Sequence, residues 1–567
     1  MPFDGFVMKT VVEKIRDLIL GKNVRNIYLY DKVIYFSFDE GDLKVSLNPN
    51  YSHVSFTNHI VKEPDKHTFV ELLRSRIRGA RVHELTTNAY ERTMIMKLRK
   101  IDEIGEKHEY ELYFDIMGKH SNAIFVENGI IIDAYKRIET RVRNIFPGEQ
   151  FTLFSSEKLP IDEVTFEKLK SALEKFQNKQ RMISEFIYST VQGFSKQTAE
   201  ELLLRSELED KPVSHITERE LEKLVVGLLS ILEEIKQKSV YIYYENEQPT
   251  DISAFRLHKY NDLKRCDDVI ACINEYFDFV ENKDKLIQKR SQLLSIVNSR
   301  ISSLEELLAQ IEKEKEECLE AEKYRKYGEL IKAYSYQIPH GGCEVELFDW
   351  ETNENVSVPL ETHLSPIENS VKYFKLYNKL KKKAEGLKER ENILRKELDY
   401  LRQLQDTIEN AETLEDLEEI EDEMIENDLI KSKHKKKGNK SKIEHTKSEP
   451  RKYLYNGFTI LVGRNNKQND ELVRKSSEHD IWLHVQGMPG AHVVIKTNGK
   501  PVEEDVLLYA AKLAAQFSKG KYSTKVPVDY TYIKYVKKPK GFKPGLVLYS
   551  NFKTLFVTPD ERFQQSK

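Results

Sequence analysis

Residues 480–496 read DIWLHVQGMPGAHVVIK. Side chains of a strand alternate between its two faces, so we expect Trp482 and His484 to share one face of a first strand. The Gly-Met-Pro-Gly turn at 487–490 then reverses the chain into a second strand that begins at His492. A polar and aromatic face beside such a turn suits stacking on a flat group. The alternative is a hairpin whose tryptophan fills a core and whose histidines hydrogen-bond to the backbone.

Opposed charges occupy separate segments of the chain. Its 567 residues are enough for about three or four domains, and its net charge is −3 although 32% of the residues are charged. Residues 411–428 hold ten Asp and Glu and no Lys or Arg, and a lysine run follows from Lys431 to Lys442. From residue 451 onward, 20 Lys and Arg stand against 10 Asp and Glu. This excess is typical of a phosphate-backbone binder, although a solvated surface would explain each block separately.

The cysteines and the N-terminal residues indicate a cytoplasmic protein. Cys266, Cys272, Cys318 and Cys343 form no Cys-x-x-Cys pair and no zinc-ribbon spacing, so we expect scattered thiols, no disulfide framework and no metal or other cofactor. The start, MPFDGF, has neither the basic nor the apolar region of a signal peptide. No run of about 18 apolar residues exists, so no membrane partner is expected.

Two long charged helical stretches, 275–334 and 366–430, carry apolar residues at a spacing of three and four. Between them lies a break at about 335–365, which contains Pro339 and two glycines and reads in part as strands. Such a break between two similar helices predicts an antiparallel arm. At 1.5 Å per residue the arm would span roughly 90 Å and return the chain after 450 toward its first domain.

The patterns as a whole predict a multidomain α+β protein. Before the arm, helix and strand patterns mix, and Gln192-Gly193-Phe194-Ser195 reads as a glycine hairpin between two helices, a motif whose amides can bind phosphate. A plain helical hairpin fits that pattern equally well. The expected parts are a mixed, glycosylase-like N-terminal domain (1–155), a helix-hairpin-helix domain (156–245), a coiled-coil arm (246–430) with a small β-containing middle element (about 335–365), a basic linker (431–450) and an α+β C-terminal domain (451–567).

Motifs of common enzymes are absent from the sequence. It has no Walker loop, nucleophile elbow, His-Glu-x-x-His or kinase set. If Met1 were removed, the amine of Pro2 could act as a Schiff-base nucleophile, as in formamidopyrimidine-type DNA glycosylases. Phe3, however, stands where those enzymes carry a catalytic glutamate, and their four-cysteine zinc finger has no counterpart here. An inert terminus is therefore the favoured interpretation.

Several motifs around the opening stretch carry a resemblance to a known family. Asn465–Asp470 precedes it, the small-residue segment Ala510–Lys519 follows, and then come Val528–Thr531 and the lysine-rich Val536–Gly545. In this order they resemble the C-terminal RNA-binding domain of the NFACT family. Pro539 and Pro544 stiffen the last segment, which should hold its ammonium groups outward. The candidate RNA-binding residues are Trp482, His484, His492, Lys537, Lys538, Lys540 and Lys543.

The rest of the chain resembles the same family over nearly its whole length. Motifs in family order are Phe3-Asp4-Gly5, 69–79, Glu91-Arg92, 115–122 (DIMGKHSN), 145–148, 192–195, 324–330, 366–370 and 373–374. The family usually has Asp-Arg at 91–92, and Glu and Arg at 115 and 119. Here Glu91, Asp115 and Lys119 keep the charge, but a lysine cannot reproduce a bidentate arginine fork.

The resemblance implies a translation factor of ribosome-associated quality control. Such a protein binds a stalled 50S subunit that carries peptidyl-tRNA, recruits charged tRNA (tRNA-Ala in bacterial members) and directs template-free alanine tailing of the nascent chain. Its partners would be rRNA, a stalk-base ribosomal protein, tRNA and the peptidyl-tRNA nascent chain. Ribosomal RNA would form the peptide bond, so the chain itself would be no enzyme. The implied tRNA-binding residues are Asp4, Glu91, Arg92, Asp115, Ile116, Met117, Lys119, His120, Ser121 and Asn122.

Two other functions stay open from the sequence. One is a glycosylase-like DNA-binding protein, which the Pro2 amine and the hairpin motif suggest. The other is a fibronectin-binding surface adhesin, suggested only by a name that relatives carry. Trapping with borohydride on damaged DNA would test the first, and export of the intact protein would test the second.

Overall fold

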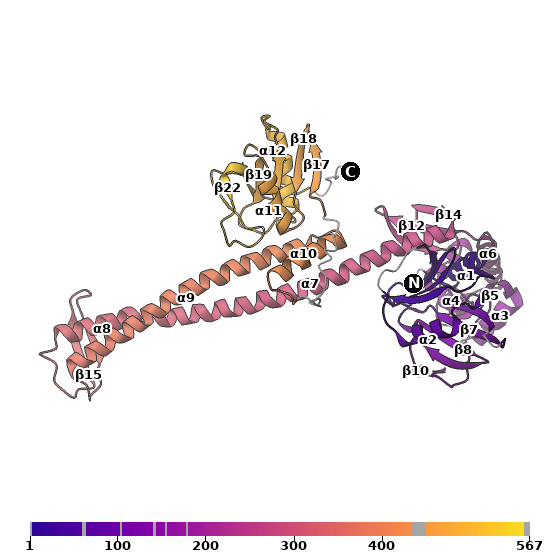
Figure 1. Cartoon of the computed structure of the whole chain (residues 1–567), viewed down its shortest axis with the longest axis horizontal. Coiled ribbons are helices and arrows are strands. Elements are labelled where there is room, and N and C mark those ends of the chain that lie inside the picture. Colours follow the sequence, from indigo (N-terminus) through magenta and orange to yellow (C-terminus); the bar gives the residue numbers. More distant parts are fainter. Residues whose placement is uncertain are drawn as a thin grey trace. The chain divides into compact units, whose positions relative to one another are not determined.

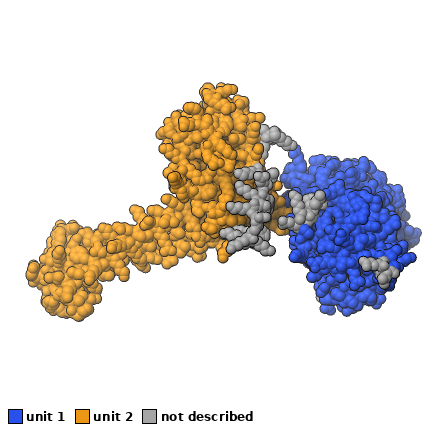
Figure 2. Space-filling model, viewed as in Figure 1, with its two compact units in different colours: residues 1–284 blue, residues 285–567 orange. Residues whose placement is uncertain are grey.

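The expected fold class, multidomain α+β with a long helical arm, is confirmed (Figure 1). The chain divides into two compact units, Met1–Asp284 and Lys285–Lys567 (Figure 2). The finer division into five parts stays a prediction. The computed structural model describes residues 3–58, 64–101, 105–139, 143–153, 156–176, 180–431 and 448–560.

Two antiparallel sheets and helix α1 form the core at the start of the first unit. The sheets have the strand orders β1-β2-β3-β4 and β5-β6-β7-β8-β9. Helix α1 buries Val7, Val11 and Ile15 completely, which accounts for its amphipathic sequence. The elements are α1 (Gly5–Ile19), β1 (Asn26–Tyr30), β2 (Val33–Phe38), β3 (Gly41–Ser46), β4 (His53–Thr57), α2 (Thr68–Ile77), β5 (Arg81–Thr87), β6 (Thr93–Ile101), β7 (Lys107–Asp115), β8 (Asn122–Glu127), β9 (Ile130–Ala134), β10 (Ile138–Glu139) and β11 (Asn144–Ile145).

A glycine hairpin joins two helices later in the first unit, as the sequence predicts. Gly193 has φ +85°, and Ser195 caps the following helix α5 with a capping box. A Cβ atom at Gly193 would lie 2.7 Å from the ring of Phe6, so the hairpin packs against α1. The elements are α3 (Phe166–Lys175), α4 (Ile183–Thr190), α5 (Lys196–Arg205), α6 (Glu218–Lys236), β12 (Val240–Glu245), β13 (Gln248–Ser253) and β14 (Leu263–Cys266).

Helices α7 and α9 run antiparallel and form the arm. Arg300 pairs with Glu397 at 2.8 Å, and Lys315, farther along α7, pairs with Glu391, earlier in α9, at 2.7 Å. The two expected helical stretches are each interrupted, because α7 ends at Cys318 and Thr413 begins α10 with a new capping box. The elements are α7 (Val269–Cys318), α8 (Ala321–Ala333), β15 (Glu344–Asp349), β16 (Glu354–Pro359), α9 (Pro366–Glu409) and α10 (Leu414–Glu426).

A six-stranded sheet forms the C-terminal part of the second unit, in the order β17-β18-β20-β19-β21-β24. Helix α12 packs on one face, which we call the α12 face, against Leu483 and Val528. Leu472 of α11 packs on the opposite, α11 face, against Trp482. The elements are β17 (Arg451–Tyr455), β18 (Phe458–Val462), α11 (Asn466–Lys475), β19 (Ile481–Val485), β20 (Val493–Lys496), α12 (Glu504–Gln516), β21 (Val526–Tyr532), β22 (Val536–Lys537), β23 (Leu548–Tyr549) and β24 (Lys553–Val557).

The expectation of scattered thiols is wrong for two cysteines. Cys266 and Cys272 form a disulfide, whereas Cys318 and Cys343 are free. Cys266 ends β14 and Cys272 lies in the first turn of α7, so a change of chain direction brings together two sulfurs whose spacing follows no common motif. Within the described ranges, no helix is long and apolar enough to cross a membrane. The same ranges hold no group of three or more His, Cys, Asp or Glu side chains that could bind a metal ion.

Candidate nucleic-acid interface

The Asp4-Gly5 motif lies against the backbone that precedes Glu91 and Arg92. Asp4 caps α1 by accepting hydrogen bonds from the backbone N–H groups of Phe6 (3.0 Å) and Val7 (2.9 Å). A Cβ atom at Gly5 would lie 1.7 Å from the carbonyl oxygen of Tyr90, so no other residue fits there without a shift of the backbone. The close approach allows the carboxyl of Asp4 and the guanidinium of Arg92 to interact electrostatically.

Burial shifts the pKa values of both members of this pair. Desolvation raises the pKa of Asp4 to about 7, although its two backbone hydrogen bonds and Arg92 oppose the rise. Burial also lowers the pKa of Arg92, against the opposing effect of Asp4 and Glu91. Glu91 itself accepts a hydrogen bond from the hydroxyl of Ser156. The result is an arginine whose neighbouring carboxyl changes charge near neutral pH.

The second N-terminal motif, residues 115–122, lies beside the first. Thr93 pairs with Asp115 across β6 and β7, and the N–H of Ile116 donates to the carbonyl of Arg92 at 2.8 Å. Asp115 is buried and accepts hydrogen bonds from the hydroxyl of Thr93 (2.8 Å) and from Arg143. The sheet therefore joins two motifs that are separated by more than twenty residues in the sequence.

Burial divides the predicted residues of this turn into two groups. Lys119 and His120 are exposed, and Met117 is half-buried. Four other predicted residues of this motif are buried. Their burial is inconsistent with the prediction that they contact RNA directly, and they instead shape the turn. The Ser121 hydroxyl, for example, accepts from the N–H of Met117 at 2.9 Å. The buried residues are Asp115, Ile116, Ser121 and Asn122.

Partners of this turn come from a segment that sequence reasoning did not select. Arg143 donates to Asp115, and the backbone N–H and carbonyl of Lys136 both bond to the amide of Asn122 at 2.8 Å. Both cations belong to the arginine- and lysine-rich run 136–143. In the sequence, only the positive charge of this run could have drawn attention to it. Its contacts with Asp115 and Asn122 depend on how the strands are aligned, which the sequence alone does not show.

The Asp4–Arg92 pair predicts a pH-dependent affinity for RNA. As pH rises through about 7, Asp4 ionises and its negative charge opposes a phosphate at Arg92, so binding should weaken by about fivefold. Asp4→Asn keeps an oxygen that can cap α1 but cannot ionise, and should remove this dependence. Filter binding of tRNA at pH 6 and pH 8 would measure it. Equal pH dependence in both proteins would contradict the role of Asp4.

The raised pKa also has a consequence for stability. A carboxyl whose pKa is higher in the folded state contributes stability that is fully present below the unfolded value of 3.8 and is lost as pH rises through about 7. Asp4→Asn should therefore flatten the stability of the first unit between pH 4 and pH 7, measured by urea unfolding.

In the C-terminal sheet, the hairpin predicted at 480–496 is confirmed. Ile481 pairs with Ile495 and Leu483 with Val493, and Gly487 has φ +67°. Trp482 and His484 share the α11 face with their rings stacked 5.7 Å apart. Trp482 and His492 are fully buried, so the ring of Trp482 packs in the core of the α11 face, as in the alternative interpretation of the hairpin.

The predicted lysine loop presents two ammonium groups and engages two others. Lys537 and Lys540 are exposed. Lys538, by contrast, pairs with Asp470 of α11. Lys543 donates to the side chain of Asn427 at 2.9 Å and lies over the ring of Tyr400. The prediction of outward-pointing lysines is therefore wrong for Lys543, because the loop folds back onto residues of the arm.

Exposed aromatic rings on the edge strand were missed by sequence reasoning. Phe556 is 61% exposed and Phe552 45% exposed, and they are four residues apart in an extended segment, so they share a face. Lys525 lies 5.0 Å from the centroid of the Phe556 ring. Aromatic rings interleaved with lysines are typical of surfaces that bind single-stranded nucleic acid.

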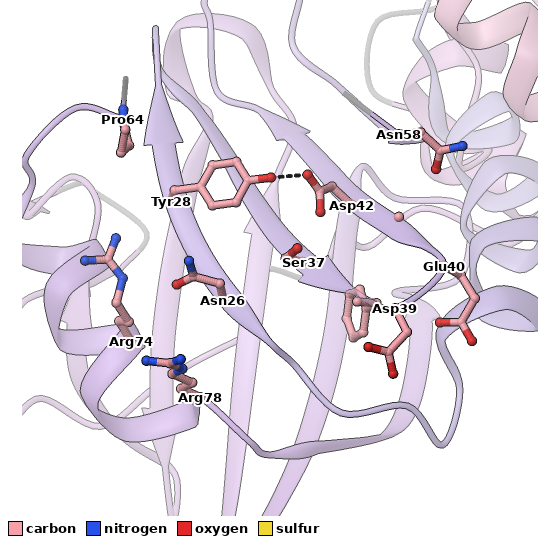
Figure 3. Close-up of a pocket in the computed structure, with 12 residues that line it drawn as sticks. Asn26, Tyr28, Ser37, Asp39, Glu40, Asp42, Asn58, Pro64, Arg74 and Arg78 are labelled. Carbon is pink, nitrogen blue, oxygen red and sulfur yellow. Dashed lines mark hydrogen bonds between the residues drawn. The ribbon is translucent and has the colours of Figure 1, made fainter. Parts of the chain in front are cut away.

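A cavity of about 890 Å³ lies beside β1–β3, but its charge does not suit a phosphate (Figure 3). Figure 3 shows Arg74 and Arg78 on one side and the carboxylates Asp39, Glu40 and Asp42 on the other. The guanidinium of Arg74 already donates two hydrogen bonds to the carbonyl of Ile27, at 3.0 and 2.7 Å. The carboxylates would repel a second negative charge, so we do not select this cavity as the nucleic-acid site.

Exposed lysines interleaved with exposed aromatic rings are typical of the class of nucleic-acid-binding proteins. Family models agree: residues 4–443 match the NFACT N-terminal and middle domains, and residues 452–551 match the NFACT protein RNA binding domain. The chain belongs to the NFACT family. The predicted resemblance is thereby confirmed.

Relatives of similar length support the assignment. The chain is 29% identical to the Rqc2 homolog RqcH of Bacillus subtilis, over 99% of this chain and 98% of that protein. It is 28% identical to the Rqc2 homolog RqcH of Streptococcus pneumoniae, over the same shares. Among solved structures, the C-terminal part of the fibronectin/fibrinogen-binding protein from Streptococcus suis matches with 31% identity and a TM-score of 0.39, over 49% of this chain and 96% of that one.

Proposed function

We propose that this chain is a ribosome-associated quality-control factor in the cytoplasm. It binds the large ribosomal subunit that still carries peptidyl-tRNA, recruits a charged tRNA, and directs template-free tailing of the nascent chain. The proposed tRNA is tRNA-Ala and the proposed tail is alanine. The ribosome forms the peptide bond, so the chain acts as a binding factor and not as an enzyme.

One observation carries the proposal: the family's two N-terminal motifs meet at one place in the first unit. Arg92 and the turn bearing Lys119 and His120 are joined by the hydrogen bond between Ile116 and Arg92. The exposed side chains of Lys119 and His120 beside the half-buried Arg92 suit a folded RNA, whose phosphates and splayed bases both accept such contacts. The RNA-binding domain at 452–551 and the similarity to Rqc2 homologues support the same function.

Sequencing the RNA that co-purifies with the tagged full-length chain tests the proposal most directly. We expect enrichment of 23S rRNA and of one or a few tRNA species, tRNA-Ala among them, over a mock purification. A stalled reporter should also gain C-terminal alanines only when the chain is present. Co-purified RNA that mirrors total cellular RNA would contradict the proposal.

The lysine loop should bind RNA through phosphates. Reversing Lys537 and Lys540 to Glu should lower the affinity for many single-stranded RNAs about tenfold at low salt, and reduce the slope of log affinity against log salt by about 1 to 2. Reversing Lys452 and Lys500 is the matched control, because both are exposed elsewhere in the same domain. Fluorescence anisotropy at several salt concentrations measures both effects. A loss confined to one RNA sequence would instead indicate base readout.

A further inference from the structure

A cavity of about 360 Å³ lies in the second unit between helix α9 and the α11 face of the C-terminal sheet. Pockets for small ligands begin at about this size. Helix α9 contributes Asp399, Arg402 and Gln403, while the sheet contributes Trp482 and His492. The arm and the RNA-binding domain therefore build this cavity together.

Two buried nitrogen atoms of the residues that line the cavity have no hydrogen-bond partner. They are Nε1 of Trp482 and Nδ1 of His492, whose side chains are 0% and 1% exposed. An indole N–H can only donate a hydrogen bond, whereas an imidazole nitrogen can donate or accept one. A buried polar group without a partner destabilises a fold, so such a group in a cavity wall points to a ligand that satisfies it.

Aromatic rings connect the cavity to the surface. The ring of Trp482 lies 4.8 Å from that of Tyr549, which also lines the cavity. Tyr549 in turn contacts Phe552 at 5.2 Å between ring centroids, and Phe552 is 45% exposed. An entering ring would thus meet the exposed Phe552 and the half-buried Tyr549 before it reached the edge of Trp482.

The charged groups of the cavity lie at its α9 side. Asp399 and Arg402 are exposed, and Arg402 donates to Glu305 at 3.0 Å. Gln403 is buried, and its amide donates a long hydrogen bond of 3.4 Å to the carbonyl of Gly545. A carboxamide has two N–H groups and an oxygen, so one such bond leaves it able to contact a ligand. Burial lowers the pKa of His492 well below its usual value, so its imidazole is neutral and offers no charge to an anion.

We propose that this cavity binds one unpaired nucleobase, held by the indole N–H of Trp482, Nδ1 of His492 and the amide of Gln403. This inference rests on the proposed RNA-binding function and adds a base-specific site to the phosphate contacts of the lysine loop. A nucleobase is flat, aromatic and bordered by both donors and acceptors, which matches uncharged ring nitrogens and an amide. A phosphate suits the cavity poorly, because its inner groups are neutral.

The two tryptophans of the chain make the site directly observable. Trp350→Phe leaves Trp482 as the remaining tryptophan of the full-length protein. We expect a 12-mer oligoadenylate or oligouridylate to change the emission of Trp482, and an abasic oligomer of equal length to leave it unchanged. By anisotropy with labelled RNA, the base-bearing oligomer should bind about tenfold more tightly than the abasic one.

Two variants and one matched control test whether the preference for base-bearing RNA arises in the cavity. Trp482→Phe removes an N–H that has no partner in the protein, and Gln403→Leu alters α9 without touching the core of the sheet. Each variant should lower the affinity for the base-bearing oligomer to that for the abasic oligomer. Gln405→Leu makes the same change two residues later, where the side chain bonds Asn298 of α7 at 2.8 Å, and should keep the preference. If Trp482→Phe does not fold, the result for Gln403→Leu alone tests the cavity proposal.

The possible outcomes distinguish a free nucleotide from an RNA base as the occupant. They also distinguish a failure of the cavity proposal from a failure of the proposed RNA-binding function. Competition by AMP, GMP, CMP or UMP at the cavity would support a base site filled by a free nucleotide, whereas competition by RNA alone would support an RNA base. Equal binding of base-bearing and abasic oligomers with unchanged Trp482 emission would overturn the cavity proposal and leave phosphate binding intact. No binding of any oligomer would overturn the proposed RNA-binding function as well.

Discussion

Removing two heptads from each helix of the arm is expected to weaken binding to the large ribosomal subunit by about tenfold or more while both units stay folded. The in-register deletion removes Ser303–Glu316 from α7 and Ala384–Glu397 from α9. These segments face each other, since Lys315 pairs with Glu391. Their loss shortens the arm by about 21 Å, so contacts near its far end could no longer form together with contacts of the second unit's sheet domain.

A matched control changes the same stretch and keeps its length. Exchanging charges in Lys315→Glu with Glu391→Lys alters the pair at 2.7 Å but preserves every helical turn, and should bind subunits normally. Sucrose-gradient co-sedimentation measures binding, and circular dichroism checks the helices. Unchanged affinity of the shortened protein would mean that arm length has no role in binding the ribosome.

The alternation of side chains along a strand and the residues of the turn were enough to predict the hairpin at 480–496 and its two faces. Trp482 and His484 fall on one face because strand side chains alternate, and Gly487 adopts the positive φ that a tight reversal favours. Ser195 likewise begins α5 as a serine cap, which needs only local hydrogen bonds. These predictions therefore needed only rules that relate neighbouring residues in the sequence.

Contacts between distant segments were beyond such rules. Lys543 bonds Asn427, which lies more than a hundred residues earlier, so sequence alone could not show that its ammonium group turns inward. Asp115 is buried and accepts hydrogen bonds from Thr93, its partner across β6 and β7, and from the side chain of Arg143, and neither contact follows from local sequence. The cavity beside Trp482 needs the docking of α9, through Gln403, against a domain that follows much later in the chain.

Replacing both Glu91 and Arg92 by Ala is expected to deplete co-purifying tRNA about tenfold or more and to abolish tailing of a stalled reporter. Arg92 supplies a guanidinium that can pair with phosphate or stack on a splayed base, and Glu91 lies beside it and is held by Ser156. Binding to the large subunit should stay largely intact, because the arm and the RNA-binding domain are unchanged. The backbone bond from Ile116 to the carbonyl of residue 92 also survives, so the neighbouring turn keeps its place.

The same first unit offers a matched control for that double variant. Arg99 and Glu109 form an exposed ion pair at 2.8 Å across β6 and β7, and replacing both by Ala removes the same two charges elsewhere on the sheet. An exposed pair of this kind contributes at most about 1 kcal/mol, so the control should fold, carry tRNA and support tailing. Arg92→Lys adds a finer distinction, because a point charge keeps phosphate attraction but loses the bidentate and stacking contacts of the guanidinium. If the Glu91 and Arg92 double variant carries as much tRNA as the control and still adds tails, these two residues do not select the tRNA.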